Sequence, residues 1–180
     1  MKHQKGVTLI EMMIVISIIA IVLLFVAPSM QSIVIKNRIV SEINDTSALI
    51  QYARHTAINE QVLTVVCPSD DYATCGDDWN DPKIVFIDED GNSTRGNDEV
   101  LLVSIEASSE TNIATASRDI IIFTESGSSI NIVEYKICHK DGNTAYAHGL
   151  TVNRQGRVKM GNDSDSNGIN EDSIGNDLSC

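Results

Sequence analysis

The sequence contains few aromatic residues, few prolines and few basic residues. Aromatic side chains make up 4% of it, so its core must be built largely from Ile, Val and Leu. Thirteen Lys and Arg stand against 25 Asp and Glu, which gives a formal net charge of −12. Because nucleic-acid affinity depends mainly on Lys and Arg, this balance argues against a generic nucleic-acid-binding protein. It fits a soluble domain in an extracytoplasmic space.

The sequence also lacks a recognisable catalytic motif. His55 falls on the polar side of a predicted helix, His139 beside a predicted disulfide, and His148 in a predicted strand. Ser126 lies in Glu-Ser-Gly, which is not the nucleophile-elbow pattern. No repeat of 20–50 residues is visible. We therefore expect a protein that is not an enzyme and that carries no cofactor.

The four cysteines include no Cys-x-x-Cys pair, so neither a zinc ribbon nor a thioredoxin-type redox site is indicated. An even number of cysteines in an exported domain favours two disulfides. Three pairings are possible. We favour Cys67–Cys75, which closes a short local loop, and Cys138–Cys180, which ties the C-terminus to a strand. Four reduced, buried cysteines are the alternative.

The longest hydrophobic run follows a short basic start. After residues 1–6 (MKHQKG), the 21 residues of Val7–Ala27 contain only three that are not apolar. As a helix, this run is about 31 Å long, which is the thickness of the hydrocarbon core of a bilayer. We expect the segment 7–28 to cross a membrane, and the lysines before it favour a cytoplasmic N-terminus. A plain signal anchor is the alternative.

Gly6-Val7-Thr8-Leu9-Ile10-Glu11, followed by the apolar run, resembles the class III signal of type IV pilins and type II secretion pseudopilins. The resemblance implies that a prepilin peptidase cleaves between Gly6 and Val7 and removes residues 1–6 as a leader. It also implies N-methylation of Val7, the new N-terminus. Phenylalanine is the usual first mature residue in that family, and Val7 departs from this pattern.

The single acid within the apolar run, Glu11, needs an explanation. A carboxylate inside a membrane helix costs roughly 2.5–3.5 kcal/mol on insertion scales. After cleavage, Val7 carries a free amine, and Glu11 of one subunit can neutralise Val7 of its neighbour, which would fix the axial register of a filament. A tolerated stray carboxylate is the alternative. Pro28 follows the run, and we expect it to bend or locally melt the helix during assembly.

The rest of the chain predicts an α+β fold. Residues 29–60 continue as an amphipathic helix, because apolar residues recur there at steps of three and four. Residues 61–180 form a β-rich globular head with an acidic C-terminal tail, and we predict strands within residues 61–67, 83–88, 100–106, 119–124, 130–138, 146–153 and 157–160. The expected fold is a long N-terminal helical spine, transmembrane and then amphipathic, packed on an antiparallel β-sheet head.

The order of motifs in this second part also resembles a family. The runs YARHTAINEQ, VVC, VFIDEDGN, YKIC and LTVNRQGRVKM are similar to the GspH-like domain, which minor pseudopilins of type II secretion share with minor pilins of the FimT/FimU type. The resemblance implies a structural subunit of a type IV pilus that acts in assembly and priming at or near the tip. A minor pseudopilin of a type II secretion system is the first alternative.

The family resemblance implies partners and a location as well. The partners are other pilins and minor pilins in a helical filament, the prepilin peptidase, and the inner membrane before assembly. Before assembly the chain would be a single-pass protein of the inner membrane with a periplasmic head. After assembly it would lie in an extracellular pilus or a periplasmic pseudopilus.

Two cations near the C-terminus suggest a second alternative. In Gly156-Arg157-Val158-Lys159, period-two alternation places Arg157 and Lys159 on the same strand face. This run is similar to the Gly-Arg-x-Arg motif of FimT-type pilins implicated in DNA uptake, which implies a DNA-binding pilin for natural transformation. Lys159 lacks the planar fork of arginine, and the acidity of the chain opposes the approach of DNA. An edge strand with solvated cations is the other interpretation.

The acidic tail, residues 161–180, contains a run similar to the start of an EF-hand calcium loop. The calcium candidates are Asp163, Asp165 and Asn167, with Glu171 or Asp172 as an irregular further ligand. Ile174 occupies the position where the bidentate glutamate of such a loop belongs. We therefore expect a solvated acidic loop and no metal centre. The acids from Asp88 to Asp98 form a similar run, which a hairpin turn explains.

Overall fold

The computed structural model describes residues 6–96 and 98–180, and it describes all of their side chains except those of residues 25–29. The chain divides into two units, Met1–Asn37 and Arg38–Cys180. One helix, α1 (Leu9–Glu60), contributes to both units. Its bounds lie within two residues of those of the predicted helical spine, residues 7–60. The bounds include Pro28, so this proline does not end the helix.

In the first unit, α1 presents its apolar side chains to the surroundings. The large apolar residues from Leu9 to Leu24 are between 45% and 77% exposed. Within the described part of the chain, no helix is both long enough and apolar enough to cross a membrane. The predicted segment 7–28 includes residues 25–28, whose side chains lie outside the description. Residues 1–5 of the predicted leader also lie outside it.

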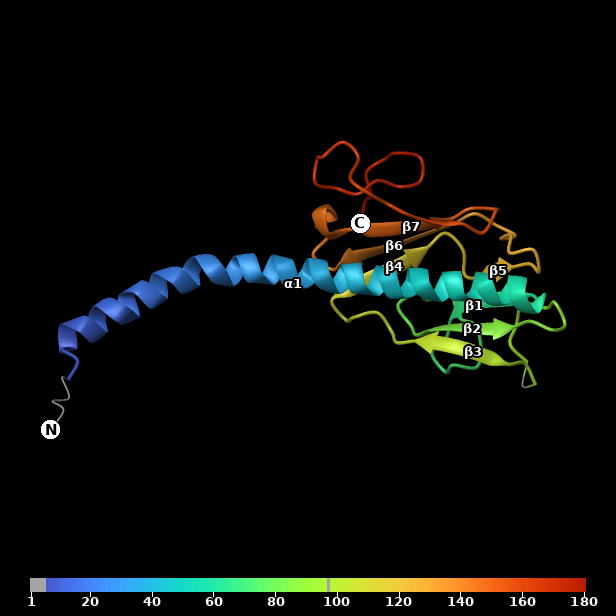
Figure 1. Ribbon diagram of the computed structural model, residues 1–180, viewed down its shortest axis with the longest axis horizontal. Helices are drawn as coiled ribbons and strands as arrows, with labels where there is room; N and C mark the ends of the chain where they lie inside the picture. Colours follow the sequence, from blue (N-terminus) through green and yellow to red (C-terminus); the bar gives the residue numbers. More distant parts are fainter. Residues whose placement is uncertain (1–5, 97) are drawn as a thin grey trace. The chain divides into compact units, whose positions relative to one another are not determined.

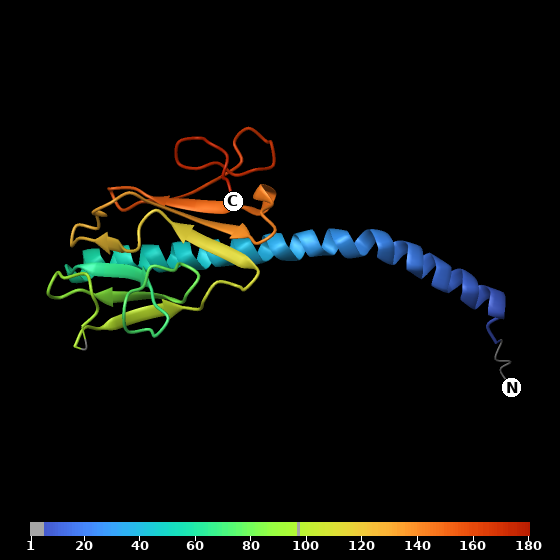
Figure 2. The same ribbon diagram turned by 180° about the vertical axis from the view of Figure 1, so that it is seen from behind.

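In the second unit, α1 buries the apolar stripe that the sequence predicts. The fully buried members of this stripe are Ile39, Ile43, Ile50, Ala53 and Ala57. This part of the helix passes in front of the β-strands in Figure 1 and behind them in Figure 2, so it covers one face of the sheets. The helix is therefore held to the head by a continuous line of aliphatic packing.

The strands form two antiparallel four-stranded sheets. The first sheet has the order β3-β2-β1-β5. Its strands are β1 (Thr64–Pro68), β2 (Lys83–Ile87), β3 (Leu101–Ile105) and β5 (Ile121–Phe123). All residues of β1 and β2 are buried, because these two strands lie in the middle of the sheet and are covered on both faces.

The second sheet has the order β4-β6-β7-β8. Its strands are β4 (Asn112–Ala116), β6 (Val133–His139), β7 (His148–Val152) and β8 (Val158–Met160). A short 3₁₀ turn, η1 (Thr144–Tyr146), precedes β7. Every predicted run overlaps a strand, but β4 lies outside all of them. Its sequence, NIATA, offers only one large apolar residue, so its composition does not distinguish it from a loop.

A cross-linked segment covers the outer face of each sheet. On the first sheet, Thr64 bonds to Ala53 of α1, so strand alternation directs Val65 and Cys67 away from the helix. Cys75, in the loop closed by the Cys67–Cys75 disulfide, packs against them. On the second sheet, the tail from Gly161 to Cys180 lies over β7 (Figure 1) and is joined to β6 through Cys138. The structure thus contains the disulfide pairing that the sequence favours.

Candidate functional site

The first turn of α1 is built by a threonine cap. The Oγ1 atom of Thr8 accepts the backbone N–H of Glu11 at 3.3 Å, and its carbonyl oxygen accepts the N–H of Met12 at 3.2 Å. A threonine at this position satisfies N–H groups that otherwise lack a partner at a helix start. The capping role of Thr8 was not among the predictions. The signal for it is the Thr-x-x-Glu spacing of a capping box.

The predicted processing site lies immediately before this cap. Gly6, Val7 and Thr8 are not helical, and a side chain at Gly6 would meet no atom within 4 Å. The bond between Gly6 and Val7 is therefore part of an open, exposed segment of backbone. Glu11 lies in the first turn, where a carboxylate interacts favourably with the helix dipole by about 0.3–1 kcal/mol. That interaction is too small to explain a carboxylate in an apolar surface by itself.

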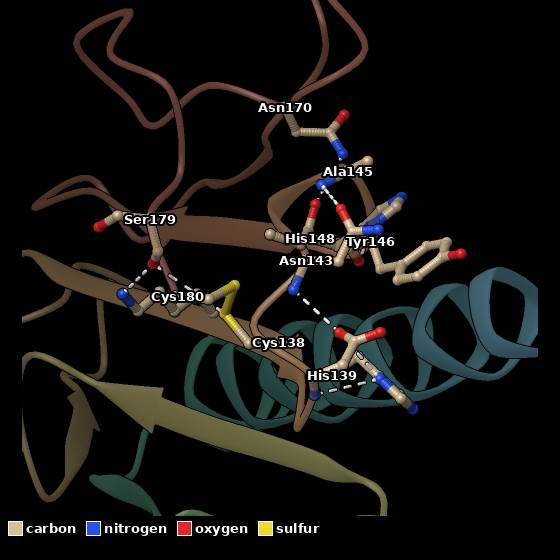
Figure 3. Close-up of a disulfide and its surroundings, with 12 residues drawn as sticks. Cys138, His139, Asn143, Ala145, Tyr146, His148, Asn170, Ser179 and Cys180 are labelled. Atoms are coloured by element: carbon tan, nitrogen blue, oxygen red, sulfur yellow. Dashed lines mark hydrogen bonds and ion pairs between the residues drawn. A yellow bond between two sulfur atoms is a disulfide. The ribbon is translucent and has the colours of Figure 1, made fainter. Parts of the chain in front are cut away.

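The acidic tail is ordered by contacts to the second sheet. Cys138 of β6 bonds to Cys180, with their Cα atoms 5.8 Å apart, as Figure 3 shows. Near η1, the side-chain amide of Asn170 donates to the carbonyl oxygen of Ala147 at 2.8 Å. The tail is therefore attached to the second sheet at two separate points, Cys180 and Asn170. His139 and His148 lie beside this tether, in agreement with their predicted places.

A cavity of about 350 Å³ separates the tail from the outer face of the second sheet. Four carboxylates and two amines line it, and these charged residues are Glu134, Lys136, Lys159, Glu171, Asp172 and Asp177. The tail is in contact with the sheet at Gly161, whose N–H donates to the carbonyl oxygen of Gly149 in β7 at 2.8 Å. A side chain at Gly161 would overlap the carbonyl oxygen of Glu171, because the tail folds back on itself there. The net charge of the cavity wall is negative, so it does not resemble a phosphate-binding groove.

The two predicted DNA-binding cations are exposed but have different surroundings. Arg157 precedes β8, and its backbone pairs with Asn153 through an N–H···O bond of 3.1 Å. Lys159 lies in β8, which is an edge strand, and it lines the acidic cavity under the tail. Carboxylates near Lys159 reduce its attraction for a phosphate backbone. The positive φ of Gly156, +72°, forms the turn that places Arg157 at the start of this strand.

The structure brings two of the three calcium candidates together. Oxygen atoms of Asp163, Asp165 and Glu171 lie within 4.8 Å of one another. The third candidate, Asn167, donates its backbone N–H to Asp163 at 3.1 Å and to Asp165 at 3.0 Å. Glu171 is 6% exposed and accepts the N–H of Ser164 at 2.9 Å. Backbone N–H groups therefore already form hydrogen bonds to the carboxylates of this cluster.

A second acidic group forms at the loop after β2. It consists of Asp88, Asp90 and Glu99. The acidic run named from the sequence ended at Asp98, so the structure has Glu99 where Asp98 was expected. Asp88 accepts the N–H groups of Gly91 and Ser93, both at 2.9 Å. This pattern is that of a tight turn closed by a carboxylate, as the hairpin interpretation expects.

A buried lysine was not predicted. Lys83, the first residue of β2, is 2% exposed, and its Nζ atom donates to the hydroxyl of Ser108 at 3.0 Å. Burial lowers the pKa of Lys83 to about 8, although the charge of Glu42 partly opposes this effect. The prediction of a strand over residues 83–88 does not indicate that the side chain of its first residue is buried. The connection between β3 and β4, which includes Ser108, supplies part of that cover.

Several polar groups beside Lys83 connect α1 to the second sheet. The Oε1 atom of Glu42 accepts the side-chain amide of Asn112 at 2.8 Å and the N–H of Ser109 at 3.2 Å. Tyr135, from β6, is 1% exposed, and burial raises its pKa to about 12. Its ring packs edge-on against Trp79, with centroids 5.4 Å apart.

Comparisons with known proteins agree with this architecture. The model of the family described as type II transport protein GspH matches residues 42–156. The model of the prokaryotic N-terminal methylation motif matches residues 1–27. Among curated proteins, none is significantly similar to this chain in sequence.

Two kinds of solved structure share the fold. The type IV minor pilin FimU of Pseudomonas aeruginosa is 19% identical, with a TM-score of 0.56 over 69% of this chain and 88% of FimU. The minor pseudopilin EpsH from the type 2 secretion system of Vibrio cholerae is 8% identical, with a TM-score of 0.50 over 68% of this chain and 95% of EpsH. The chain therefore belongs to the GspH family, and it is a minor pilin or pseudopilin of the type IV pilus and type II secretion class.

Proposed function

We propose that this chain is a minor pilin, a structural subunit at or near the tip of a type IV pilus that helps to prime its assembly. The observation that carries the proposal is the first unit of the chain. It is a helix whose large apolar side chains, from Leu9 to Leu24, are all at least 45% exposed, with one acid in its first turn. In water such a surface would associate, so it requires lipid or other helices of the same kind.

In this proposal, Glu11 pairs with the new N-terminus of a neighbouring subunit. Cleavage between Gly6 and Val7 leaves an ammonium group one residue before the capped turn. Packed among apolar helices, that ammonium needs an anion, because an unpaired charge in such a setting costs several kcal/mol. Glu11 of a neighbouring subunit supplies the anion and fixes the axial register. The inner membrane holds the chain before assembly, and the prepilin peptidase prepares its N-terminus.

The test compares two substitutions of polar residues in the same apolar helix. Full-length wild type, Glu11→Ala and Ser17→Ala are produced in a piliated host, and the chain is quantified in sheared filaments and in membranes. We expect Glu11→Ala to lower the filament fraction more than about tenfold, because 1.4 kcal/mol already corresponds to tenfold. Ser17 donates to the carbonyl oxygen of Met13 within its own helix, so Ser17→Ala should behave as wild type. Equal filament fractions for all three chains would contradict the proposal.

A minor pseudopilin of a type II secretion system is the second candidate, because the matching family model is described as type II transport protein GspH and EpsH, which shares the fold, is a minor pseudopilin. The two functions differ in what fails when the gene is deleted. Loss of surface pili with normal export of secreted enzymes supports the pilus function. Loss of export with normal pili supports the secretion function. Immunogold labelling at pilus tips tests the position within the filament.

A DNA-binding pilin is the third candidate, and the exposure of Arg157 and Lys159 is the observation that favours it. The full-length chain in detergent is titrated into labelled double-stranded DNA at low salt. A DNA-binding function predicts a shift that disappears in Arg157→Ala/Lys159→Ala and weakens with salt. No shift at low salt would remove this candidate.

A further inference from the structure

The acidic tail contains the only Asn-Gly pair of the sequence, Asn167-Gly168. Because glycine has no Cβ, the backbone nitrogen that follows this asparagine is less shielded than it would be in any other residue. Both residues are exposed, and a side chain at Gly168 would meet no atom within 4 Å. The nitrogen of Gly168 can attack the side-chain amide carbon of Asn167 and close a succinimide ring, because the two residues are covalently adjacent.

The backbone nitrogen of Gly168 has an acceptor for its proton. Its N–H donates to the Oδ2 atom of Asp163 at 2.9 Å. The other oxygen of Asp163 accepts the backbone N–H of Asn167 at 3.1 Å, so the carboxylate is held against both residues of the pair. An amide nitrogen becomes a nucleophile only as it loses its proton, and a positioned carboxylate can take that proton as a general base. Asp163 is therefore placed to activate the nitrogen of Gly168.

The side-chain amide of Asn167 is held at both of its polar atoms. Its oxygen, Oδ1, accepts the backbone N–H of Ile169 at 2.8 Å. Its nitrogen donates to Asp165 at 3.1 Å and to Asp177 at 3.0 Å. When a nucleophile adds to the amide carbon, negative charge develops on Oδ1, and a backbone N–H aimed at that oxygen stabilises the charge. One short loop therefore supplies the nucleophile, a general base and an oxyanion donor.

We propose that Asn167 is a self-modification site, at which the folded tail promotes the deamidation of its own asparagine. A bond forms between the nitrogen of Gly168 and the amide carbon of Asn167, while the bond from that carbon to the amide nitrogen breaks. Ammonia leaves with the proton that Asp163 accepted from Gly168. Water then opens the succinimide ring and leaves aspartate or isoaspartate at position 167.

The modification loosens the tail. The amide nitrogen of Asn167 is a donor that joins Asp165 to Asp177, so it connects two parts of the tail that are ten residues apart along the chain. Deamidation replaces this donor by a carboxylate, which only accepts hydrogen bonds when ionised. The new carboxylate faces Asp163, Asp165 and Asp177, and like charges at such short range repel one another. The disulfide between Cys138 and Cys180 still holds the end of the tail.

Hydrogen exchange tests the consequence for the tail. Asn167→Asp reproduces the charge of the product, and we expect the backbone amides of residues 162–177 to exchange faster in this variant than in the wild type. The control is Asn44→Asp, the same charge change at an exposed asparagine of α1, and it should leave exchange in the tail unchanged. Equal exchange of the tail in Asn167→Asp and in the wild type would overturn this part of the proposal.

Peptide mapping by mass spectrometry tests the reaction itself. The full-length chain in detergent is incubated at neutral pH, and the conversion of each asparagine to aspartate or isoaspartate is followed with time. We expect Asn167 to convert faster in the folded chain than in the same chain unfolded in urea with its disulfides reduced. Asp163→Asn should slow this conversion about tenfold or more, because it removes the general base. The control is Asp172→Asn, the same charge change at a carboxylate that bonds to Ile174 and Asn176, and it should leave the rate unchanged.

Two results would overturn the proposal. One is a rate of conversion at Asn167 in the folded wild type that is equal to or below the rate in the unfolded chain. The other is an unchanged rate in a folded Asp163→Asn chain. The emission of Trp79 confirms that each variant is folded, and the first comparison uses the wild type alone, so it does not depend on any variant.

Discussion

The burial of Lys83 makes the stability of the second unit depend on alkaline pH in a calculable way. In the folded chain the pKa of Lys83 is about 8, and in the unfolded chain it has its ordinary value of 10.5. Below pH 8 the side chain is protonated in both states, and burial of its charge opposes folding. Between pH 8 and 10.5 the folded chain releases this proton first, so the free energy of unfolding rises with pH.

The size of this rise follows from the difference between the two pKa values. Each pKa unit corresponds to 1.36 kcal/mol, so the full effect is about 3 kcal/mol. Tyr135 acts in the opposite direction at higher pH. Its pKa is raised from 10.0 to about 12, so from pH 10 to 12 the unfolded chain ionises this group first and the free energy of unfolding falls. The two groups together predict maximal stability near pH 10.

Urea unfolding of the full-length chain in detergent micelles, at a series of pH values from 7 to 12, measures this profile. The single tryptophan, Trp79, is 3% exposed and donates its indole N–H to Arg118, so its fluorescence reports loss of the fold. The control is Lys83→Met, which should lose the rise between pH 8 and 10 but keep the fall above pH 10. A constant or falling free energy of unfolding in the wild type between pH 8 and 10 would refute the reasoning.

Two further predictions concern the backbone and the tail. Gly156→Ala should destabilise the chain by about 3 kcal/mol or more, because its φ is +72° and the added carbon would overlap the carbonyl oxygen of Gly127. Gly142→Ala has a nearly equal φ of +74° and open space, so its cost should be only about 1 kcal/mol; equal urea midpoints for the two would contradict the packing argument. Cys138→Ser/Cys180→Ser should cost about 4 kcal/mol, because the bridge spans 42 residues, and an unchanged urea midpoint would show that the bridge contributes nothing.

The parts of the fold that the sequence predicts are those with a strong local signal. The α1 stripe repeats at helical spacing, and its members Ile39, Ile43 and Ile50 are fully buried, as an amphipathic helix packed on the head predicts. The strands rich in Ile and Val were also located within a few residues. The missed strand β4 has a sequence in which Ala and Thr alternate, and it is a strand because β6 pairs with it along all five residues. That pairing is a tertiary contact, which no local pattern encodes.

The polar groups of the second unit show a different limit of sequence reasoning. Glu42 lies within the predicted amphipathic helix and Lys83 begins a predicted strand, and charged residues at such positions are normally solvated. The burial of Lys83 and the partial burial of Glu42 depend on the path of the connection between β3 and β4, which brings Ser108 and Ser109 against them. The cap formed by Thr8, by contrast, can be predicted from the sequence, because it depends only on residues within one turn.

The mass of the chain recovered from sheared filaments is the most direct test of its assignment as a filament subunit. Mass spectrometry of the intact and digested chain reads its N-terminus, its methylation and its disulfides in one experiment. We predict a chain that begins at Val7, carries a methyl group on that amine, and contains the bridges Cys67–Cys75 and Cys138–Cys180. A chain that retains its first six residues, or one found only in the cytosol, would contradict it.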